Sequence, residues 1–289
     1  MENPSLESSH YLAAVDIGNS SIQLGLFTRS SLQKMASPPV AGKHVPLALR
    51  YFFPNELEKV ASFLSENLSE REAIFWAIGS VAPDTLLLFQ SWLSANRPND
   101  SLVVVDHHLV PLKTEVSPIE RVGIDRLLAT YAVTLKKSPA SPAIVVDSGT
   151  ALTIEAISAE SIFLGGAILP GLRLSAEALG RGTAHLPLLP TNFSQKPPVI
   201  GTNTELAIQS GLYHQAIGSA KEVVLAIAQN WKSEGYTGPI EIYFAGGNGA
   251  FLSDSLADTL PKHFLCHHCE TLVLQGLLFT LGLTPRATS

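Results

Sequence analysis

The sequence predicts an α/β protein built from two similar halves, and three observations support this fold class. Short β-prone apolar runs alternate along the chain with segments whose apolar residues recur at helical spacing. A hairpin pattern with Asp-x-Gly at its turn occurs twice, at residues 14–22 and 145–153, with Val, Asp and Gly in register. An aromatic run that leads into small residues also occurs twice in the same order, at 75–80 and 243–248. Both repeats together favour duplication over chance.

The elements follow in order from these patterns. Each hairpin is expected to have a second strand, at 22–27 and 153–157. Helical spacing predicts helices over 52–67, 85–95, 124–135, 204–230 and 272–281, and β-branched or aromatic runs predict strands over 102–105 and 240–244. Residues 165–171 are expected to form a Gly-rich turn. A boundary between residues 111 and 118 then gives two domains, 1–115 and 116–289, with a cleft between them.

Composition and charge narrow the function classes. The 289 residues are 46% hydrophobic and 15% charged, which is too apolar for a disordered chain. A net charge of −6 gives no basic field for nucleic acid. Apolar runs fall far short of the roughly 20 residues that a membrane span needs. Residues 1–10 are polar and acidic, unlike an export signal, so a short disordered leader and a cytoplasmic location are expected.

The two cysteines lie close together in the sequence. Cys266 and Cys269 flank His267 and His268, and thiolate with imidazole is a ligand set that zinc uses. Structural zinc sites normally take their ligand pairs from two separate segments, however. Ordinary reduced thiols in a loop or at a helix start are therefore the favoured interpretation.

Two turns have the chemistry of a phosphate site. In residues 16–21 and 147–150 an aspartate precedes glycine and hydroxyl residues, so bare backbone N–H groups can reach phosphate oxygens while the carboxylate holds a cation. One such turn alone is more often an Asp that caps its own turn, but the duplication reverses that preference. Gly246 and Gly247 end a strand before a helix and leave room for a base or ribose, although a plain strand-to-helix turn explains them equally well.

A further polar cluster lies at residues 123–126. Asp125 is suited to accept a proton from a substrate hydroxyl, and the neighbouring Arg126 to hold a substrate carboxylate. The alternative, an Asp that caps a helix beside a surface Arg, is about as plausible from sequence alone.

Together these motifs resemble the type III pantothenate kinases. The matching patterns are Asp16-x-Gly-Asn-Ser, Gly123-x-Asp-Arg, Asp147-x-Gly-Thr, Gly165-Gly-x-Ile-x-Pro-Gly and Gly201-x-Asn-Thr, in an order that extends from about Tyr11 to Leu283. That family belongs to the acetate and sugar kinase, Hsp70 and actin superfamily. The resemblance implies two similar ribonuclease H-like domains, a duplicated actin-like ATPase fold with a nucleotide cleft between the domains. It also implies an ATP-dependent enzyme that phosphorylates pantothenate to 4′-phosphopantothenate, the first step of coenzyme A biosynthesis.

The resemblance also implies roles for individual residues. Asp125 is the expected proton acceptor, and Asp147 the ligand of a potassium ion, with magnesium accompanying ATP. Thr204 is expected to contact pantothenate across a homodimer interface. The expected pantothenate contacts are Gly123, Ile124, Asp125, Arg126 and Thr204. The expected ATP contacts are Asp16, Ile17, Gly18, Asn19, Ser20, Ser21, Ile22, Gln23 and Thr150, to which the Gly246–Gly247 turn is added from the residue pattern.

The chain departs from the family pattern in two places. Gln23 stands where the family usually has Lys, so one positive charge on the phosphates is missing, and residues 115–118 replace a Tyr and an Asn-Pro pair. These departures leave two alternatives open. One is a non-catalytic nucleotide-binding regulatory protein on the same fold, and the other a related phosphotransferase or polyphosphate hydrolase.

Overall fold

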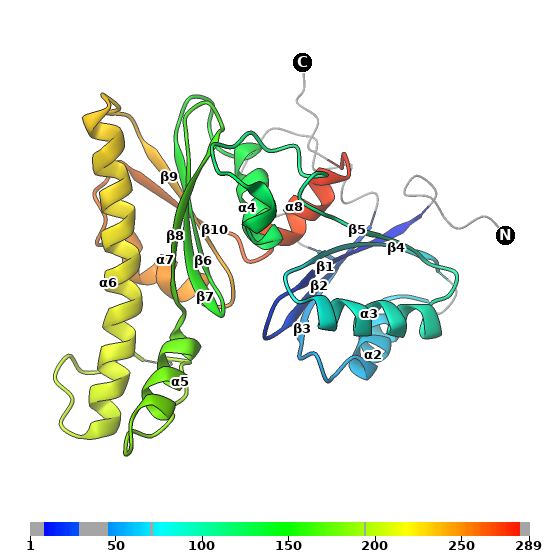
Figure 1. Ribbon diagram of the computed structural model, residues 1–289, viewed down its shortest axis with the longest axis horizontal. Coiled ribbons are helices and arrows are strands. Elements are labelled where there is room, and N and C mark those ends of the chain that lie inside the picture. Colours follow the sequence, from blue (N-terminus) through cyan, green and yellow to red (C-terminus); the bar gives the residue numbers. More distant parts are fainter. Residues whose placement is uncertain (1–8, 29–45, 70–71, 194, 284–289) are drawn as a thin grey trace. The chain divides into compact units, whose positions relative to one another are not determined.

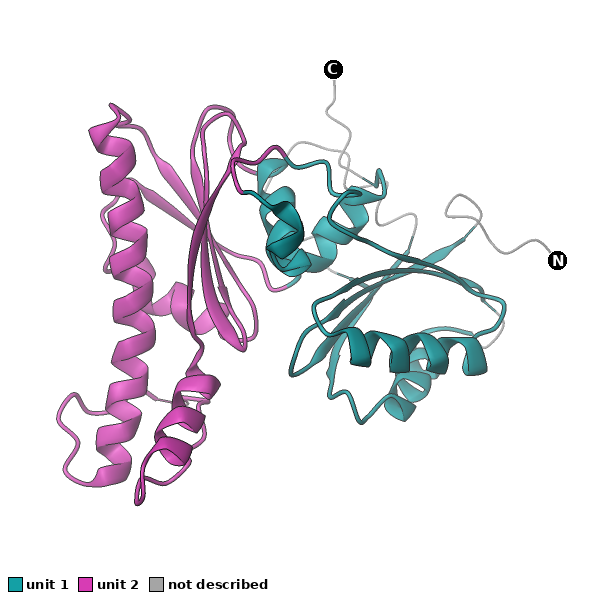
Figure 2. Ribbon diagram, in the orientation of Figure 1, with its two compact units in different colours: residues 1–112, 117–136, 271–289 teal, residues 113–116, 137–270 magenta. Residues whose placement is uncertain are grey.

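The computed structural model describes residues 9–28, 46–69, 72–193 and 195–283 (Figure 1). The leader expected at residues 1–10 lies outside these ranges except for its last two residues. The chain forms two compact units (Figure 2). Unit 1 comprises residues 1–112, 117–136 and 271–289, and unit 2 comprises residues 113–116 and 137–270.

Unit 1 contains a five-stranded sheet in the order β3-β2-β1-β4-β5. The first three strands pair antiparallel, whereas β4 and β5 run parallel to β1. The strand bounds are β1 Tyr11–Ile17, β2 Ile22–Thr28, β3 Ala48–Phe52, β4 Ile74–Ser80 and β5 Ser101–Val104.

Helices cover both faces of this sheet (Figure 1). On one face, α2 (Glu58–Asn67) and α3 (Pro83–Asn96) pack over a buried apolar cluster that includes Trp76 and Phe89. On the other face lie α4 (Ile124–Thr134) and α8 (Leu272–Thr280), which contact each other closely. A side chain at Gly276 of α8 would overlap the backbone of Leu128 in α4, so glycine permits this approach.

Unit 2 contains a second five-stranded sheet in the order β10-β9-β6-β7-β8. Here β6, β7 and β8 pair antiparallel, and β9 and β10 run parallel to β6. The strand bounds are β6 Ala143–Ser148, β7 Ala151–Ile157, β8 Phe163–Pro170, β9 Ile240–Ala245 and β10 Phe264–His268.

Three helices accompany the second sheet. The long α6 (Thr204–Ser233) packs against it over an apolar cluster that contains Val224, Trp231 and Phe244. Near the first residues of α6 lies α5 (Leu172–Gly182), and α7 (Gly249–Ala257) follows β9 (Figure 1). No helix in the described ranges has the length and hydropathy required to cross a bilayer.

The two sheets have the same topology, which confirms the predicted fold class of two similar α/β halves. Read from the opposite edge, the order β8-β7-β6-β9-β10 repeats β3-β2-β1-β4-β5, with the same strand directions. The structure shifts the second sequence repeat, which matches residues 75–80 with 243–248, by two residues. Gly79 lies opposite Asp16 and Ala245 lies opposite Asp147, so Gly79, not Ala77, corresponds to Ala245.

The compact units interleave along the chain, whereas the predicted domains 1–115 and 116–289 divide it at one point. The difference comes from α4 and α8, which follow residue 115 but pack on the sheet of unit 1. The domain division therefore stays a proposal about the duplicated halves of the sequence.

Three local predictions are wrong. Residues 163–170 form strand β8 and not a turn, and residues 264–268 form strand β10 and not a loop or helix start. The predicted helix over 52–67 begins only at Glu58, because residues 48–52 form the edge strand β3. The glycines of β8 suggest a turn but serve the strand itself. Gly165 has a φ of +102°, and a side chain at Gly166 would overlap the carbonyl oxygen of Ile154 on β7.

Candidate functional site

In unit 1 the first Asp-x-Gly motif forms the turn between β1 and β2. Ile17 pairs with Ile22, so residues 18–21 make the turn, which is closed by a 3.0 Å hydrogen bond from Gly18 N to the carbonyl oxygen of Ser21. Asp16 and Gln23 are direct cross-strand partners below it. All eight residues predicted at the first loop therefore lie together at this end of the hairpin.

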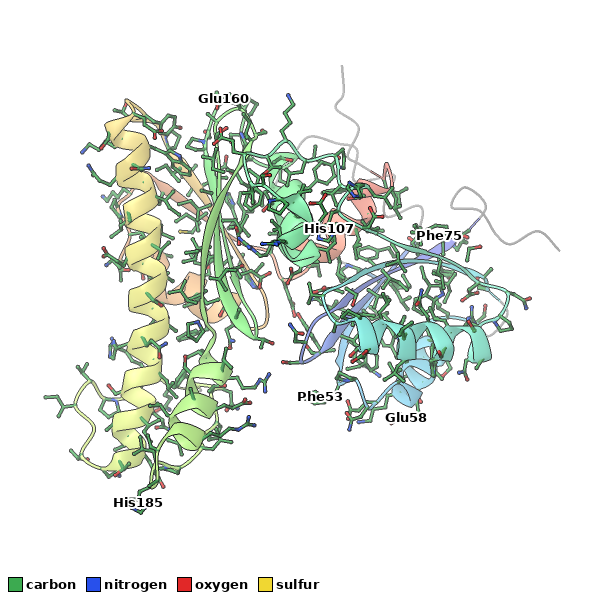
Figure 3. The ribbon with its side chains drawn as sticks, viewed as in Figure 1. Phe53, Glu58, Phe75, His107, Glu160 and His185 are labelled. Carbon is green, nitrogen blue, oxygen red and sulfur yellow. The ribbon has the colours of Figure 1, made fainter. Side chains whose placement is uncertain are left out.

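The second motif of unit 1 lies beside the same strand end. Val81 follows β4, and its N–H donates to the carbonyl oxygen of Ile17 over 3.0 Å. Gly123 packs next to the Val81 side chain. The residue before it, Val122, accepts a 2.8 Å hydrogen bond from Nε2 of His107, which is labelled in Figure 3. Contacts through Val81 thus bring the 123–126 motif next to the end of β1.

Asp125 occupies the first turn of α4. Its Oδ1 accepts a 2.8 Å hydrogen bond from the backbone N–H of Arg126, and a side chain at Gly123 would overlap that oxygen. Burial raises the pKa of Asp125 above its ordinary value, although the hydrogen bond and the charge of Arg126 act in the opposite direction. A carboxylate with a raised pKa is a stronger base, which suits proton abstraction.

In unit 2 the second Asp-x-Gly motif forms a shorter turn. Ser148 pairs with Leu152, so the turn consists of Gly149, Thr150 and the start of β7, with a 2.9 Å hydrogen bond from Gly149 N to the carbonyl oxygen of Ala151. Asp147 precedes this turn and lies opposite Thr153.

Two further segments of unit 2 close around this turn. Gly246 has a φ of +78°, and a side chain there would overlap Oδ1 of Asp147. The N–H of Asn248 donates to the carbonyl oxygen of Ser148 over 3.0 Å. Gly171 donates to the carbonyl oxygen of Thr150 over 3.1 Å, and a side chain at Gly171 would overlap the same oxygen. The predicted residues Asp147, Thr150, Gly246 and Gly247 therefore belong to one cluster.

Val81 is not among the predicted site residues, and the sequence patterns include Asn248 only as part of the 243–248 repeat and Gly171 only as the end of a Gly-rich turn. Each follows a predicted strand or begins a helix, so only the tertiary contacts bring it to a site.

Thr204 is the first residue of α6. The side chain of Asn203 caps this helix by accepting a 2.8 Å hydrogen bond from the N–H of Leu206. A side chain at Gly201 would overlap the backbone of Ala207. The Gly-x-Asn-Thr motif thus builds a helix start that leaves Thr204 exposed.

The Cys-His-His-Cys stretch gains no support as a zinc site. Within the described ranges no three His, Cys, Asp or Glu side chains are grouped closely enough to hold a metal. Cys266 lies on β10 opposite Ile242 of β9. The ring of His267 instead stacks on Tyr243, with centroids 4.7 Å apart, and its Nε2 lies 3.2 Å from a carboxylate oxygen of Glu241.

The family model that the chain matches and three similar proteins all have the same description. Residues 12–226 match the family model described as type III pantothenate kinase. The chain is 31% identical over 249 residues to a type III pantothenate kinase of Rubrobacter xylanophilus, an alignment that covers 84% of this chain and 88% of the relative. It is 35% identical over 201 residues to the one of Synechococcus elongatus, with 68% and 73% covered.

The same name belongs to a Legionella pneumophila relative, strain Corby, which is 39% identical over 161 residues. That alignment covers 56% of this chain and 57% of the relative, so the chain spans a little over half of the length of this relative.

Proposed function

Because the chain belongs to the type III pantothenate kinase family, we propose that it transfers the γ-phosphoryl group of ATP to the primary hydroxyl of pantothenate, giving 4′-phosphopantothenate. The observation that carries this proposal is Asp125, a partly buried carboxylate with a raised pKa beside the strand end where the first loop turns. The product is the first intermediate on the route to coenzyme A.

In the proposed reaction Asp125 orients the hydroxyl of pantothenate and takes its proton. A bond forms between the hydroxyl oxygen and the γ-phosphorus, the bond from that phosphorus to the β–γ bridging oxygen breaks, and ADP leaves with the electron pair. The proton passes from Asp125 to solvent. Most of the acceleration comes from positioning and from charge stabilisation.

The neighbours of Asp125 form the acceptor side. Gly123 leaves the room that the Asp125 carboxylate occupies, and Ile124 is buried at the start of α4. Arg126 is proposed to bind the carboxylate of pantothenate through its guanidinium fork, a geometry that suits bidentate pairing.

ATP is assigned to the two turns. The loop of residues 16–23 is proposed to bind the phosphates, because a short turn with Gly18, Asn19 and two serines exposes backbone N–H groups and hydroxyls. Thr150, Gly246 and Gly247 are proposed as further ATP contacts, supported by their common cluster in unit 2. A divalent metal, magnesium, would accompany the triphosphate and offset its charge.

Asp147 is proposed to hold a potassium ion. Its carboxylate and the carbonyl oxygen of Ser148 both lie against Gly246. Hard cations prefer oxygen donors of these two kinds, so the residues fit such an ion. When bound, the ion would supply positive charge near the nucleotide.

A homodimer in which Thr204 reaches the pantothenate of the partner completes the proposal, together with a cytoplasmic location. Support for the dimer comes from the segment shortly before Thr204: Val199 and Ile200 are apolar, and Ile200 is 81% exposed. A closed two-fold dimer is the commonest way to cover such a surface.

The test is ADP release by the purified chain with and without pantothenate, combined with mass spectrometry of the product. ADP formed only with pantothenate, together with 4′-phosphopantothenate, is expected. Nucleotide binding without turnover would favour the regulatory alternative, and ADP release independent of pantothenate would favour a hydrolase or another acceptor.

A further inference from the structure

One row of side chains crosses the sheet of unit 1 at the end that carries the first turn. Gly79 of β4 pairs with Asp16 of β1, Asp16 with Gln23 of β2, and Gln23 with Tyr51 of the edge strand β3. Direct cross-strand partners stand on the same face of a sheet. The carboxylate, the amide and the phenol are therefore successive neighbours on one face, directly below the turn of residues 18–21.

Within this row Tyr51 anchors Gln23. The amide nitrogen Nε2 of Gln23 donates to the Tyr51 hydroxyl oxygen over 2.6 Å, between atoms whose residues are 28 positions apart. Gln23 is only 7% exposed, whereas Tyr51 is 42% exposed, so the amide is fixed inside and the phenol reaches it from the edge of the sheet. Glutamine has several rotatable bonds and loses much conformational freedom when it is ordered. The Tyr51 hydroxyl selects one of the orientations open to it.

The orientation of the Gln23 amide matters because this side chain carries no charge. Gln23 is neutral, so it interacts with an anionic ligand only through the direction of its amide dipole and hydrogen bonds. Such interactions depend on orientation, whereas the attraction of an ammonium group acts over a longer range and weakens with salt. The contribution of the Gln23 amide to anion binding therefore depends on the residue that fixes its orientation.

We infer that Tyr51 is a positioning residue for nucleotide binding, which acts by holding the Gln23 amide beside the turn that binds the phosphates. This inference rests on the proposed function, because it takes the turn of residues 18–21 as the phosphate loop. Tyr51 itself is not proposed to touch a reacting atom.

The variant Tyr51→Phe removes only the hydroxyl. We expect the dissociation constant for Mg-ATP, measured by calorimetry, to rise ~3–10-fold, the effect of losing one hydrogen bond. The KM for ATP should rise in parallel, while kcat at saturating ATP and the KM for pantothenate stay within about twofold of wild type. The matched control is Tyr236→Phe in unit 2, which removes a hydroxyl that donates to the carbonyl oxygen of Pro239 over 2.7 Å.

A double-mutant cycle with Gln23→Lys separates positioning from folding. Lysine has no amide to orient and supplies a charge, so Gln23→Lys should tighten Mg-ATP binding, make it more sensitive to salt, and abolish the effect of Tyr51→Phe. Equal ATP affinity in Tyr51→Phe and wild type would overturn the inference, as would an undiminished Tyr51→Phe effect in the Gln23→Lys background. Because ATP binding is measured directly, absence of pantothenate phosphorylation by wild type would count against the proposed function and not against this inference.

Discussion

The hairpins β1–β2 and β6–β7 show how two copies of one topology differ at their turns. Each lies at the centre of a five-stranded sheet and has an aspartate at the end of its first strand. The turn in unit 1 contains residues 18–21, whereas in unit 2 only Gly149 and Thr150 separate the strands. The two halves therefore share the topology of the sheet but differ in the length of the turn and in the residues around it.

The two aspartates, Asp16 and Asp147, also have chemically different neighbours. In unit 2, Gly246 and Gly171 press against Asp147 and the Thr150 carbonyl, which makes a cluster rich in backbone oxygen. In unit 1 the strand end adjoins Val81 and then the 123–126 motif, which adds a second carboxylate, Asp125. We therefore expect changes in unit 2 to affect ATP and cation binding, and changes around Asp125 to affect phosphoryl transfer.

Asp125→Asn should give the largest effect. The side chain keeps its shape and its acceptor oxygen for Arg126 N–H but loses the ability to take a proton, so kcat should fall ~10²–10⁴-fold. Steady-state kinetics with both substrates measure this. Near-wild-type turnover would remove Asp125 from the mechanism.

Gly246→Ala against Gly247→Ala tests the cluster of unit 2. Gly246 has a positive φ and lies against Asp147, whereas a side chain at Gly247 meets nothing within 4 Å. We expect Gly246→Ala to cost about 1–3 kcal/mol of unfolding free energy through backbone strain and to weaken ATP binding. Denaturant unfolding and calorimetry provide the measurements. Equal losses of unfolding free energy in the two variants would contradict the proposed role of Gly246 in this cluster.

Thr204→Ala should raise the KM for pantothenate ~3–10-fold and leave the KM for ATP nearly unchanged, the effect of one lost hydrogen bond. In a dimer with shared sites, mixing Thr204→Ala subunits with Asp125→Asn subunits should restore part of the activity at pantothenate concentrations below KM, because one site in each mixed dimer is intact. A fully active monomer in sedimentation, or no restoration despite subunit exchange, would contradict the shared site.

Potassium should stimulate the reaction more than sodium or a bulky organic cation, because the family resemblance implies potassium at Asp147, where the carboxylate and the Ser148 carbonyl supply oxygen donors for a hard cation. Initial rates at constant ionic strength in the three chloride salts test this. Equal rates would argue against the potassium assignment.

The pKa of Asp125 leads to the smallest predicted effect. Because its folded pKa is raised, the contribution of this group to stability is fully present below its unfolded pKa and is lost as pH rises through the folded pKa. Asp125→Asn should therefore raise the Tm slightly at neutral pH but not at low pH, as measured by calorimetric scans. The same titration should make kcat/KM for pantothenate fall as pH drops through the raised pKa. A Tm that falls at neutral pH would contradict this sign.

Much of the architecture could be predicted from the sequence because its patterns are local. Both hairpins, α3, α4, α6, β9 and α8 are visible in the periodicity of apolar residues. The edge strand β3 was missed because its last residue, Phe52, also fits the spacing of the helix that follows. Strand β8 was missed because its glycines serve close packing on β7, which no local pattern reveals.

The candidate site was predictable in part. Repetition identified Asp16 and Asp147, and the pairing of unlike charges drew attention to Asp125 and Arg126. Long-range packing determines the rest: Val81 joins two motifs of unit 1, and Tyr51 reaches Gln23 across 28 residues. Such contacts follow from strand register, which the sequence alone leaves open.

The most direct test of the proposed division between the two aspartates compares Asp125→Asn with Asp147→Asn under identical conditions. For each variant, the Mg-ATP dissociation constant and the single-turnover rate of 4′-phosphopantothenate formation are measured in potassium buffer. We predict that Asp125→Asn binds ATP within about twofold of wild type but fails to transfer phosphate, whereas Asp147→Asn binds ATP more weakly. Phosphate transfer by Asp125→Asn at close to the wild-type rate would show that Asp125 is not the proton acceptor.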